Sequence, residues 1–308
     1  MILLAALLFI AIAAFLVKRF LSKNPTVTLD YSFGNTELKS IQILIEEGEF
    51  QRAAEAFGAL TYNQQSYAVD LLALTIKTEL LQSWVCTEGG TGLDGLVLAT
   101  HYHHLNWQFD LNSSFAHATR PEQLKYQSNL DKAKEHLELI ENSRSFFLEK
   151  SIRQIRVKLL DGKQEEAWNH FVAATNQESD AFWAYVFAAD VVQPKWGGDL
   201  NNVQTLLDKL PQVTEIRMVV MLKLIEDSFT TNENLFKGGM NDLVAFASEQ
   251  LNAMHQQVQQ TQLDPLHQFV VFNYMKALAE RLGDKQLKQT YLTKGRGFRT
   301  LLPDGPVF

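Results

Sequence analysis

Two stretches of this chain share one pattern, which constrains the fold more than any other feature. Residues 41–60 read IQILIEEGEFQRAAEAFGAL and residues 156–175 read RVKLLDGKQEEAWNHFVAAT. A glycine allows the chain to turn where a Cβ atom would clash. A small alanine allows two helices to approach closely, and an aromatic ring fills the groove beside it. Each stretch therefore predicts two antiparallel helices joined by a glycine turn, with these residues at matching offsets: Gly48, Ala53 and Phe57, then Gly162, Ala167 and Phe171.

Such hairpins cannot bury their apolar stripes alone, so they must stack on one another. The composition agrees, because hydrophobic residues make up 46% of the chain and only 7 residues are proline. No convincing alternating run bounded by turn residues predicts a strand. The two hairpins lie 114 residues apart, which is not a whole multiple of the usual repeat of about 34 residues. We therefore predict an all-α fold, an irregular tetratricopeptide-like superhelix that includes diverged helix pairs.

Helical spacing and turn residues predict the other elements. Asn35 or Thr36 is placed to cap the first helix, and Pro121 is placed in the first turn of another. A third Leu-Gly-Asp turn at Gly283 is a weaker match, because Lys288 replaces the alanine. The remaining helices are expected near residues 65–85, 96–109, 121–142, 179–192, 199–210, 213–227, 239–260, 265–282 and 284–293.

The first 17 residues predict a membrane anchor. Residues 2–17, ILLAALLFIAIAAFLV, contain no polar side chain, and residues 2–21 as a helix reach roughly 30 Å, close to the bilayer core. A cleaved signal peptide is the alternative, but Lys18 and Arg19 stand where a small-residue cleavage site is expected. Together with Lys23, these charges favour a cytoplasmic body behind a single-pass anchor in a bacterial inner membrane. The predicted segments are an anchor at 1–23, a linker at 24–34, a helical domain at 35–293 and an irregular tail at 294–308.

The charge balance argues against nucleic acid as a partner. Three of the 28 basic residues precede Asp30, which leaves 25 basic against 35 acidic residues, a balance of −10 for the body. An acidic body repels phosphate backbones. Cys86 is the sole cysteine, so a disulfide framework is excluded.

The chain also resembles a known group of helical proteins. The two glycine hairpins resemble the second half of tetratricopeptide repeats. The segments 81–85 (LQSWV), 102–107 and above all 194–198 (PKWGG) are similar to a bacterial family of tetratricopeptide-like proteins of unassigned function. The likeness covers roughly residues 64–210, but the sequence after Trp107 lacks the Arg-Gly pair that the family pattern leads us to expect. The resemblance implies a fold and no established activity.

Three histidines and one aspartate carry the ligand types of a zinc site: His101, His103, His104 and Asp110. On a helix, however, positions 101 and 103 point in different directions, while His103 and Trp107 share a face. The metalloprotease motif His-Glu-x-x-His is also absent. We therefore expect no metal ion and no other cofactor, and a metal-dependent hydrolase built on these residues is an alternative hypothesis.

A glycine-rich segment, Gly90-Thr-Gly-Leu-Asp-Gly95, matches G-x-G-x-x-G and precedes a predicted helix. The same motif in dinucleotide-binding folds follows a parallel strand, which supplies the cradle for the phosphates. Here a helix precedes it. We therefore interpret the segment as an interhelical loop.

The tryptophans divide into two groups. Trp84, Trp168 and Trp183 lie on apolar stripes and are predicted to be core residues. Trp196 lies in a turn after Pro194, where it either covers the ends of helices or contacts a ligand. We predict no catalytic residue, and the candidate partner-binding residues are Trp196, His103, His104 and Trp107.

The sequence does not define a specific reaction. It favours a membrane-anchored, non-enzymatic helical-repeat protein that binds a protein or peptide partner in a concave groove. The alternatives are the metal-dependent hydrolase and an immunity-type inhibitor of a toxin near the membrane.

Overall fold

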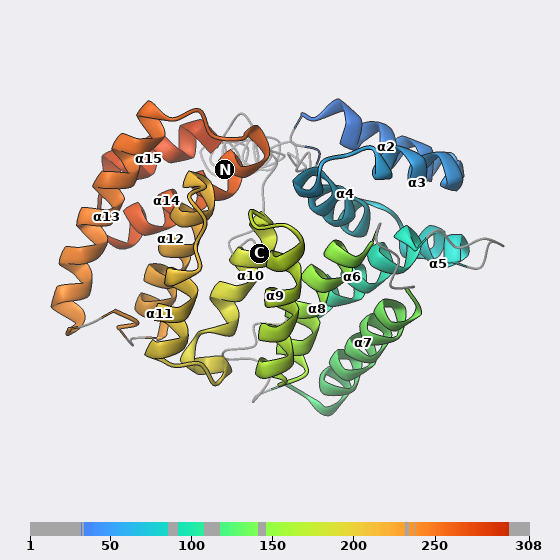
Figure 1. Cartoon of the computed structure of the whole chain (residues 1–308), viewed down its shortest axis with the longest axis horizontal. Coiled ribbons are helices and arrows are strands. Elements are labelled where there is room, and N and C mark those ends of the chain that lie inside the picture. The colour runs from blue at the N-terminus through green and yellow to red at the C-terminus, as the bar shows by residue number, and fades with distance from the viewer. Residues whose placement is uncertain are drawn as a thin grey trace, which may run out of the picture.

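The computed structural model describes residues 32, 34–85, 92–107, 118–140, 146–231, 234–236 and 238–295. All regular structure in these residues is helical, so the all-α prediction is confirmed for them. The helices pack in antiparallel pairs (Figure 1). They are α2 (Thr36–Glu46), α3 (Phe50–Gly58), α4 (Tyr62–Thr75), α5 (Thr78–Val85), α6 (Leu93–Trp107), α7 (Arg120–Leu139), α8 (Phe147–Leu160), α9 (Gln164–Gln177), α10 (Phe182–Val191), the 3-10 helix η1 (Pro194–Trp196), α11 (Leu200–Asp208), α12 (Thr214–Thr231), α13 (Met240–Gln260), α14 (Pro265–Arg281) and α15 (Lys285–Gly295).

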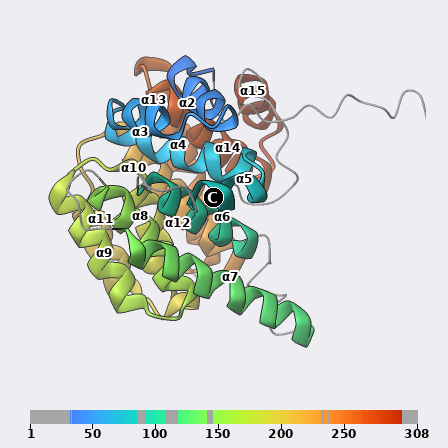
Figure 2. The same ribbon diagram turned by 90° about the vertical axis from the view of Figure 1, so that its right-hand side faces the viewer.

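The even-numbered helices from α4 to α14 form an inner row in which each helix contacts the next. Every residue of α10 is buried, whereas α9 buries three residues and α11 only two. The odd-numbered helices cover the row from outside: α7 lies at the lower right in Figures 1 and 2, and α13 lies at the left edge of Figure 1. Because α10 is covered on several sides, its sequence is apolar all round the helix and not only along one stripe.

The inner row also curves back on itself. Helix α4 contacts α10, although more than a hundred residues separate them in the chain. The backbone N–H of Phe182 donates to Asn63 Oδ1 at 3.2 Å. The ring of His267, on α14, stacks on Phe182 at 3.9 Å between centroids and lies 6.0 Å from the ring of Tyr67 on α4. The inner face is therefore packed where these three helices meet.

The glycine turns are confirmed. Gly48 and Gly162 have φ angles of +80° and +73°, a region that side chains with a Cβ atom rarely adopt. In the second hairpin, Lys163 N donates to Lys158 O at 2.9 Å and Gly162 N donates to Leu159 O at 3.0 Å, which is the bonding of a Schellman cap. Four residues that follow these turns are fully buried as predicted: Ala53, Phe57, Ala167 and Phe171.

The turn at Gly283 belongs to the same type, with φ of +75° and a bond from Asp284 N to Ala279 O at 2.8 Å. Lys288 does not occupy the buried position that alanine has in the other two hairpins. The buried positions of α15 are Leu287 and Tyr291, one residue earlier in the pattern. A shift of one residue rotates the buried face of a helix by about 100°, so α15 turns a different face toward its neighbours than the second helix of the other two hairpins does.

We predict that Gly162→Ala destabilises the full chain by about 1 kcal/mol. The alanine would have to adopt a left-handed conformation, which costs about 1–2 kcal/mol, and reduced freedom of the unfolded chain offsets part of this cost. No atom lies within 4 Å of the added Cβ, so the effect is conformational rather than steric. The midpoint of urea unfolding measures it. A Gly162→Asn variant should lose less, because asparagine tolerates the left-handed region better, and an unchanged midpoint in the alanine variant would contradict the prediction.

The prediction of one continuous helix over residues 65–85 is wrong. Ile76 has an extended conformation, with φ of −79° and ψ of 138°, and separates α4 from α5. Two bonds of His101 hold the break: Nδ1–H donates to Ala73 O at 2.8 Å, and Nε2 lies 3.0 Å from Thr78 Oγ1. This ring therefore satisfies a carbonyl near the end of α4 and a hydroxyl at the start of α5.

The other predicted helix boundaries agree with the structure within a few residues. The Asn35 side chain accepts from Glu37 N and Leu38 N, and Asp199 accepts from Asn202 N, so both act as N-caps. The predicted anchor at 1–23 and most of the linker and tail lie outside the described residues. Among the residues that are described, no helix combines the length and hydropathy needed to cross a bilayer.

Candidate functional site

Charged side chains are buried along the inner row. Three of them lie within apolar segments, YAVDLLAL, FAADVV and VMLKLIE, whereas α8 carries several charges. Sequence analysis did not identify them, although for these three a charge inside an apolar segment was a signal that could have done so. We call this set the charged band: the buried residues Asp70 on α4, Glu149, Arg153 and Arg156 on α8, Asp190 on α10 and Lys223 on α12, together with the partly exposed Asp227 on α12.

The first part of the band joins α4 to α8. Arg153 Nη1 lies 2.6 Å from Asp70 Oδ1, and Nη2 lies 3.2 Å from Glu149 and donates to Ser66 O at 2.8 Å. The Ser66 hydroxyl also donates to Glu149. One guanidinium group thus satisfies two carboxylates and a carbonyl, all shielded from solvent.

The two carboxylates respond differently to burial. Burial alone would raise the pKa of Asp70, but Arg153 and a hydrogen bond from His104 outweigh it and lower the pKa below its usual value. Burial raises the pKa of Glu149, and Arg153 and Ser66 offset only part of that effect. Asp70 is therefore the main counter-charge of Arg153.

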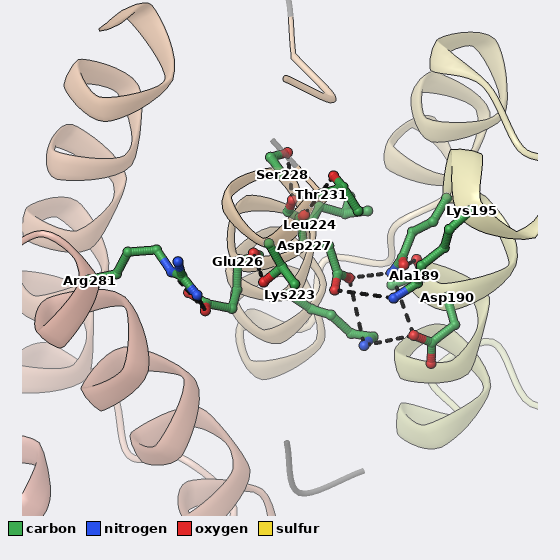
Figure 3. Close-up of polar contacts among 12 residues, drawn as sticks. Ala189, Asp190, Lys195, Lys223, Leu224, Glu226, Asp227, Ser228, Thr231 and Arg281 are labelled. Atoms are coloured by element: carbon green, nitrogen blue, oxygen red, sulfur yellow. Dashed lines mark hydrogen bonds and ion pairs between the residues drawn. The ribbon is translucent and has the colours of Figure 1, made fainter. Parts of the chain in front are cut away.

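The second part joins α10 to α12 (Figure 3). Lys223 extends from α12 and places Nζ 2.8 Å from Asp190 and 3.7 Å from Asp227. Gln193 donates to Asp227 and, at 2.9 Å, to Ala189 O, while Lys195 Nζ lies 3.9 Å from Asp227. On the far side of α12, Glu226 binds Arg281 of α14 at 2.6 Å.

These contacts hold Lys223 as a cation. Burial alone would lower its pKa, but Asp190 and Asp227 outweigh burial and raise it. Burial raises the pKa of Asp227, and repulsion from Asp190 adds to the increase. The Arg153–Asp70 and Lys223–Asp190 pairs each join two different helices, so they help to fix how neighbouring hairpins stack.

His103 and His104 lie in the interior rather than on an open surface, with 6% and 9% of their areas exposed. His104 Nε2–H donates to Asp70 Oδ1 at 3.1 Å. Burial lowers the pKa of His104, although Asp70 opposes the effect, and burial lowers the pKa of His103 well below its usual value, with Arg156 adding to it. A partner could reach these two rings only if neighbouring inner helices moved. The side chain of Trp107 is outside the described residues.

The structure does not bring the three histidines together as metal ligands. His101 bridges the break between α4 and α5, and His104 binds Asp70. In the part of the chain that is described, no group of three or more histidine, cysteine or acidic side chains is placed to hold one metal ion. Asp110 is not among those residues.

Trp196 forms a corner at the end of α10. It is half-buried and packs against the core. Its turn is closed by three bonds: Trp196 N to Gln193 O at 3.0 Å, Gly197 N to Pro194 O at 2.9 Å and Gly198 N to Gln193 O at 3.0 Å. The indole Nε1 has no hydrogen-bond partner among the described residues. The PKWGG segment is thus a helix stop that also places Lys195 against the charged band.

The two described glycines of the G-x-G-x-x-G segment have packing roles. Gly92 has φ of +80° at the start of α6. A Cβ atom on Gly95 would lie 3.0 Å from Ile140 and 3.3 Å from the His136 carbonyl oxygen, so Gly95 allows α6 and α7 to approach closely. This is the role expected of an interhelical segment.

No family model, no curated protein and no solved structure matches this chain.

Proposed function

We propose that this chain is a membrane-tethered, non-enzymatic scaffold of tetratricopeptide-like hairpins that binds a protein or peptide partner on the surface around Trp196, at the end of α10. The observation that carries the proposal is the recurrence of one glycine turn in three hairpins, at Gly48, Gly162 and Gly283, together with the continuous row of even-numbered helices. Stacked hairpins of this kind produce extended surfaces that recognise other chains.

The charged band supports this function because it makes the scaffold rigid. Arg153–Asp70 and Lys223–Asp190 each link two inner helices through short, buried contacts. A rigid inner row loses little entropy when a partner binds. Trp196 is half-buried at the end of α10, so part of its large aromatic side chain is open to a partner, which suits a hot-spot contact.

The tether completes the proposal. Residues 2–17 form an apolar run, and residues 2–21, as an anchor in a bacterial inner membrane, hold the body in the cytoplasm. Anchoring raises the effective concentration of the scaffold near membrane partners. The resemblance of PKWGG to a tetratricopeptide-like family supports the same class.

Site-specific photo-crosslinking in cells tests the proposal. A photoreactive phenylalanine analogue replaces Trp196, which keeps an aromatic ring at the corner, and a control variant carries it at Leu124, an exposed residue of α7. We expect a discrete crosslinked protein from position 196 and none from position 124. Absence of an adduct at 196, or the same adducts at both positions, would contradict binding at the surface around Trp196. Circular dichroism of both variants confirms that they are folded.

A further inference from the structure

A buried histidine lies where the inner row curves back on itself. His267, near the start of α14, is only 3% exposed. Its ring stacks on Phe182 of α10, with 3.9 Å between centroids and 8° between the ring planes, and lies 6.0 Å from the ring of Tyr67 on α4. We call these three rings the α14 contact. Because Phe182 and Tyr67 are also buried, this contact is part of the packing that joins α14 to helices much earlier in the chain.

The polar atoms of this histidine are not satisfied. A neutral imidazole ring carries one N–H donor and one acceptor nitrogen. Neither Nδ1 nor Nε2 of His267 has a hydrogen-bond partner among the described residues. Unpaired polar groups in a protein interior are unfavourable, and a phenylalanine ring would fill the same stack without them. Packing alone therefore does not explain a histidine at this position.

The surroundings of His267 disfavour its protonated form. Burial lowers the pKa of His267 below the ordinary value of 6.5, and the charges of Asp264, Glu215 and Asp180 offset only part of this effect. His267 also lies in the first turn of α14, where the positive end of the helix dipole disfavours a cation.

The nearby acidic groups come from three segments and two of them already bind backbone donors. Asp264 caps α14 and accepts from Leu266 N at 2.8 Å. Glu215, in the first turn of α12, accepts from Asp264 N at 2.9 Å. Asp180 precedes α10 and interacts with Glu178. On α4, burial raises the pKa of Tyr67 well above its ordinary value, so its hydroxyl stays neutral.

We propose that His267 is a pH switch, and that its protonation in mildly acidic conditions separates α14 from α4 and α10. The imidazolium carries a second N–H donor and a full charge, and water can solvate both only when the α14 contact opens. Opening exposes the apolar rings of Phe182 and Tyr67, which are buried while His267 is neutral. The switch is a property of the helical body and does not rest on the proposed partner binding.

The direction of the pH dependence follows from linkage. Since the pKa of His267 is lower in the closed contact than in water, the closed contact keeps its full stability above about pH 6.5 and loses stability as the pH falls toward the lowered value. Asp180 raises the pKa of Glu178 to about 7, and a raised pKa has the opposite effect, because it favours the folded state at lower pH. Protonation of Glu178 therefore does not explain a loss of stability in acid.

Amide hydrogen exchange of the full chain in detergent micelles, corrected for the effect of pH on intrinsic exchange, tests the switch. Protection of residues 265–272 should fall about fivefold from about pH 7 to about pH 5.5, because one proton changes an equilibrium constant by at most tenfold per pH unit. His267→Phe keeps a stacked ring that cannot be protonated, so its protection should be the same at both pH values.

His255→Phe is the matched control. His255 is a half-buried histidine of α13 that bonds Tyr291 at 2.8 Å, and this variant should keep the fall in protection of the natural chain. The buried histidines of α6, His103 and His104, remain in both variants, so the difference between the variants isolates His267.

Two results would overturn the switch: equal protection of residues 265–272 at both pH values in the natural chain, or an undiminished fall in His267→Phe. If the phenylalanine variant does not fold, His267→Gln, which also does not titrate in this range, decides the matter by the same measurement. A missing crosslink at position 196 would reject the partner-binding function and leave the switch intact, whereas constant protection would reject the switch alone.

Discussion

Replacing Arg153 with methionine is expected to destabilise the full chain by about 3–5 kcal/mol, because the change leaves two buried carboxylates without their cation. Arg153 contacts both Asp70 and Glu149, and the side chains of all three are at most 7% exposed. Methionine fills a similar volume, so lost packing explains little of the effect. Urea unfolding followed by far-ultraviolet circular dichroism measures the change in midpoint.

The effect should depend on pH in a defined direction. Without Arg153, burial raises the pKa of Asp70 and Glu149 above their values in the unfolded chain. A carboxyl group with a raised pKa in the folded state contributes its full stability below the unfolded pKa, about 4, and loses it as pH rises through the folded pKa. The natural chain and the variant should therefore differ less at about pH 4 than at pH 7.

Two control variants isolate the ion pairs. Arg52→Met removes an exposed arginine whose contact with the Glu49 carboxylate is long at 3.7 Å, and it should change stability by less than about 0.5 kcal/mol. The triple variant Asp70→Asn, Glu149→Gln, Arg153→Met removes the charges together and should recover part of the loss. An Arg153→Met chain as stable as Arg52→Met at pH 7 would show that the buried carboxylates do not need the guanidinium group.

The hairpins could be predicted from sequence because local chemistry determines them. A glycine at Gly48 or Gly162 is required by a positive φ angle, and the buried alanine and phenylalanine follow at helical spacing. The third hairpin shows the limit of this reasoning. Its glycine turn was recognisable, but the buried face begins one residue earlier, at Leu287, because contacts with α13 and α14 select the register; Tyr291, for example, bonds His255 at 2.8 Å.

The break at Ile76 could not be predicted because no glycine or proline marks it. It depends on His101, which comes from a helix further along the chain. The same limit applies to the histidines as a candidate site. Their spacing along α6 was visible in the sequence, whereas the positions of Asp70, Thr78 and Arg156 around them follow from how the hairpins stack.

The charged band shows where composition misleads. A surplus of acidic residues in the composition suggests only a solvated, acidic surface, and most charged side chains do lie on the surface. The functional candidates are instead the few charges inside α4, α8, α10 and α12, where pairing across helices compensates burial. Only the three-dimensional structure shows which acidic side chain pairs with which basic one.

Replacing Gly198 with alanine is expected to destabilise the chain by about 3 kcal/mol. A Cβ atom at this position would lie 2.1 Å from the Val192 carbonyl oxygen and 2.3 Å from its carbon. Both atoms belong to the backbone, so no side chain can rotate away, and the turn itself must move. That movement would displace Gln193, whose carbonyl accepts from Gly198 N and whose amide binds Asp227. The turn that ends α10 and the contacts in the second part of the charged band should therefore be destabilised together.

The midpoint of urea unfolding measures the loss, and amide hydrogen exchange should show faster exchange at the end of α10 and in η1 than elsewhere. Gly58→Ala is the matched control. Gly58 lies at the end of α3, with no atom within 4 Å of an added Cβ and without a positive φ angle. Alanine there should be neutral or stabilise the helix by up to about 1 kcal/mol. If Gly198→Ala unfolded at the same urea concentration as Gly58→Ala, the PKWGG turn would be able to move without loss of stability. The close approach of Gly198 to Val192 would then not be needed to join the end of α10 to the charged band.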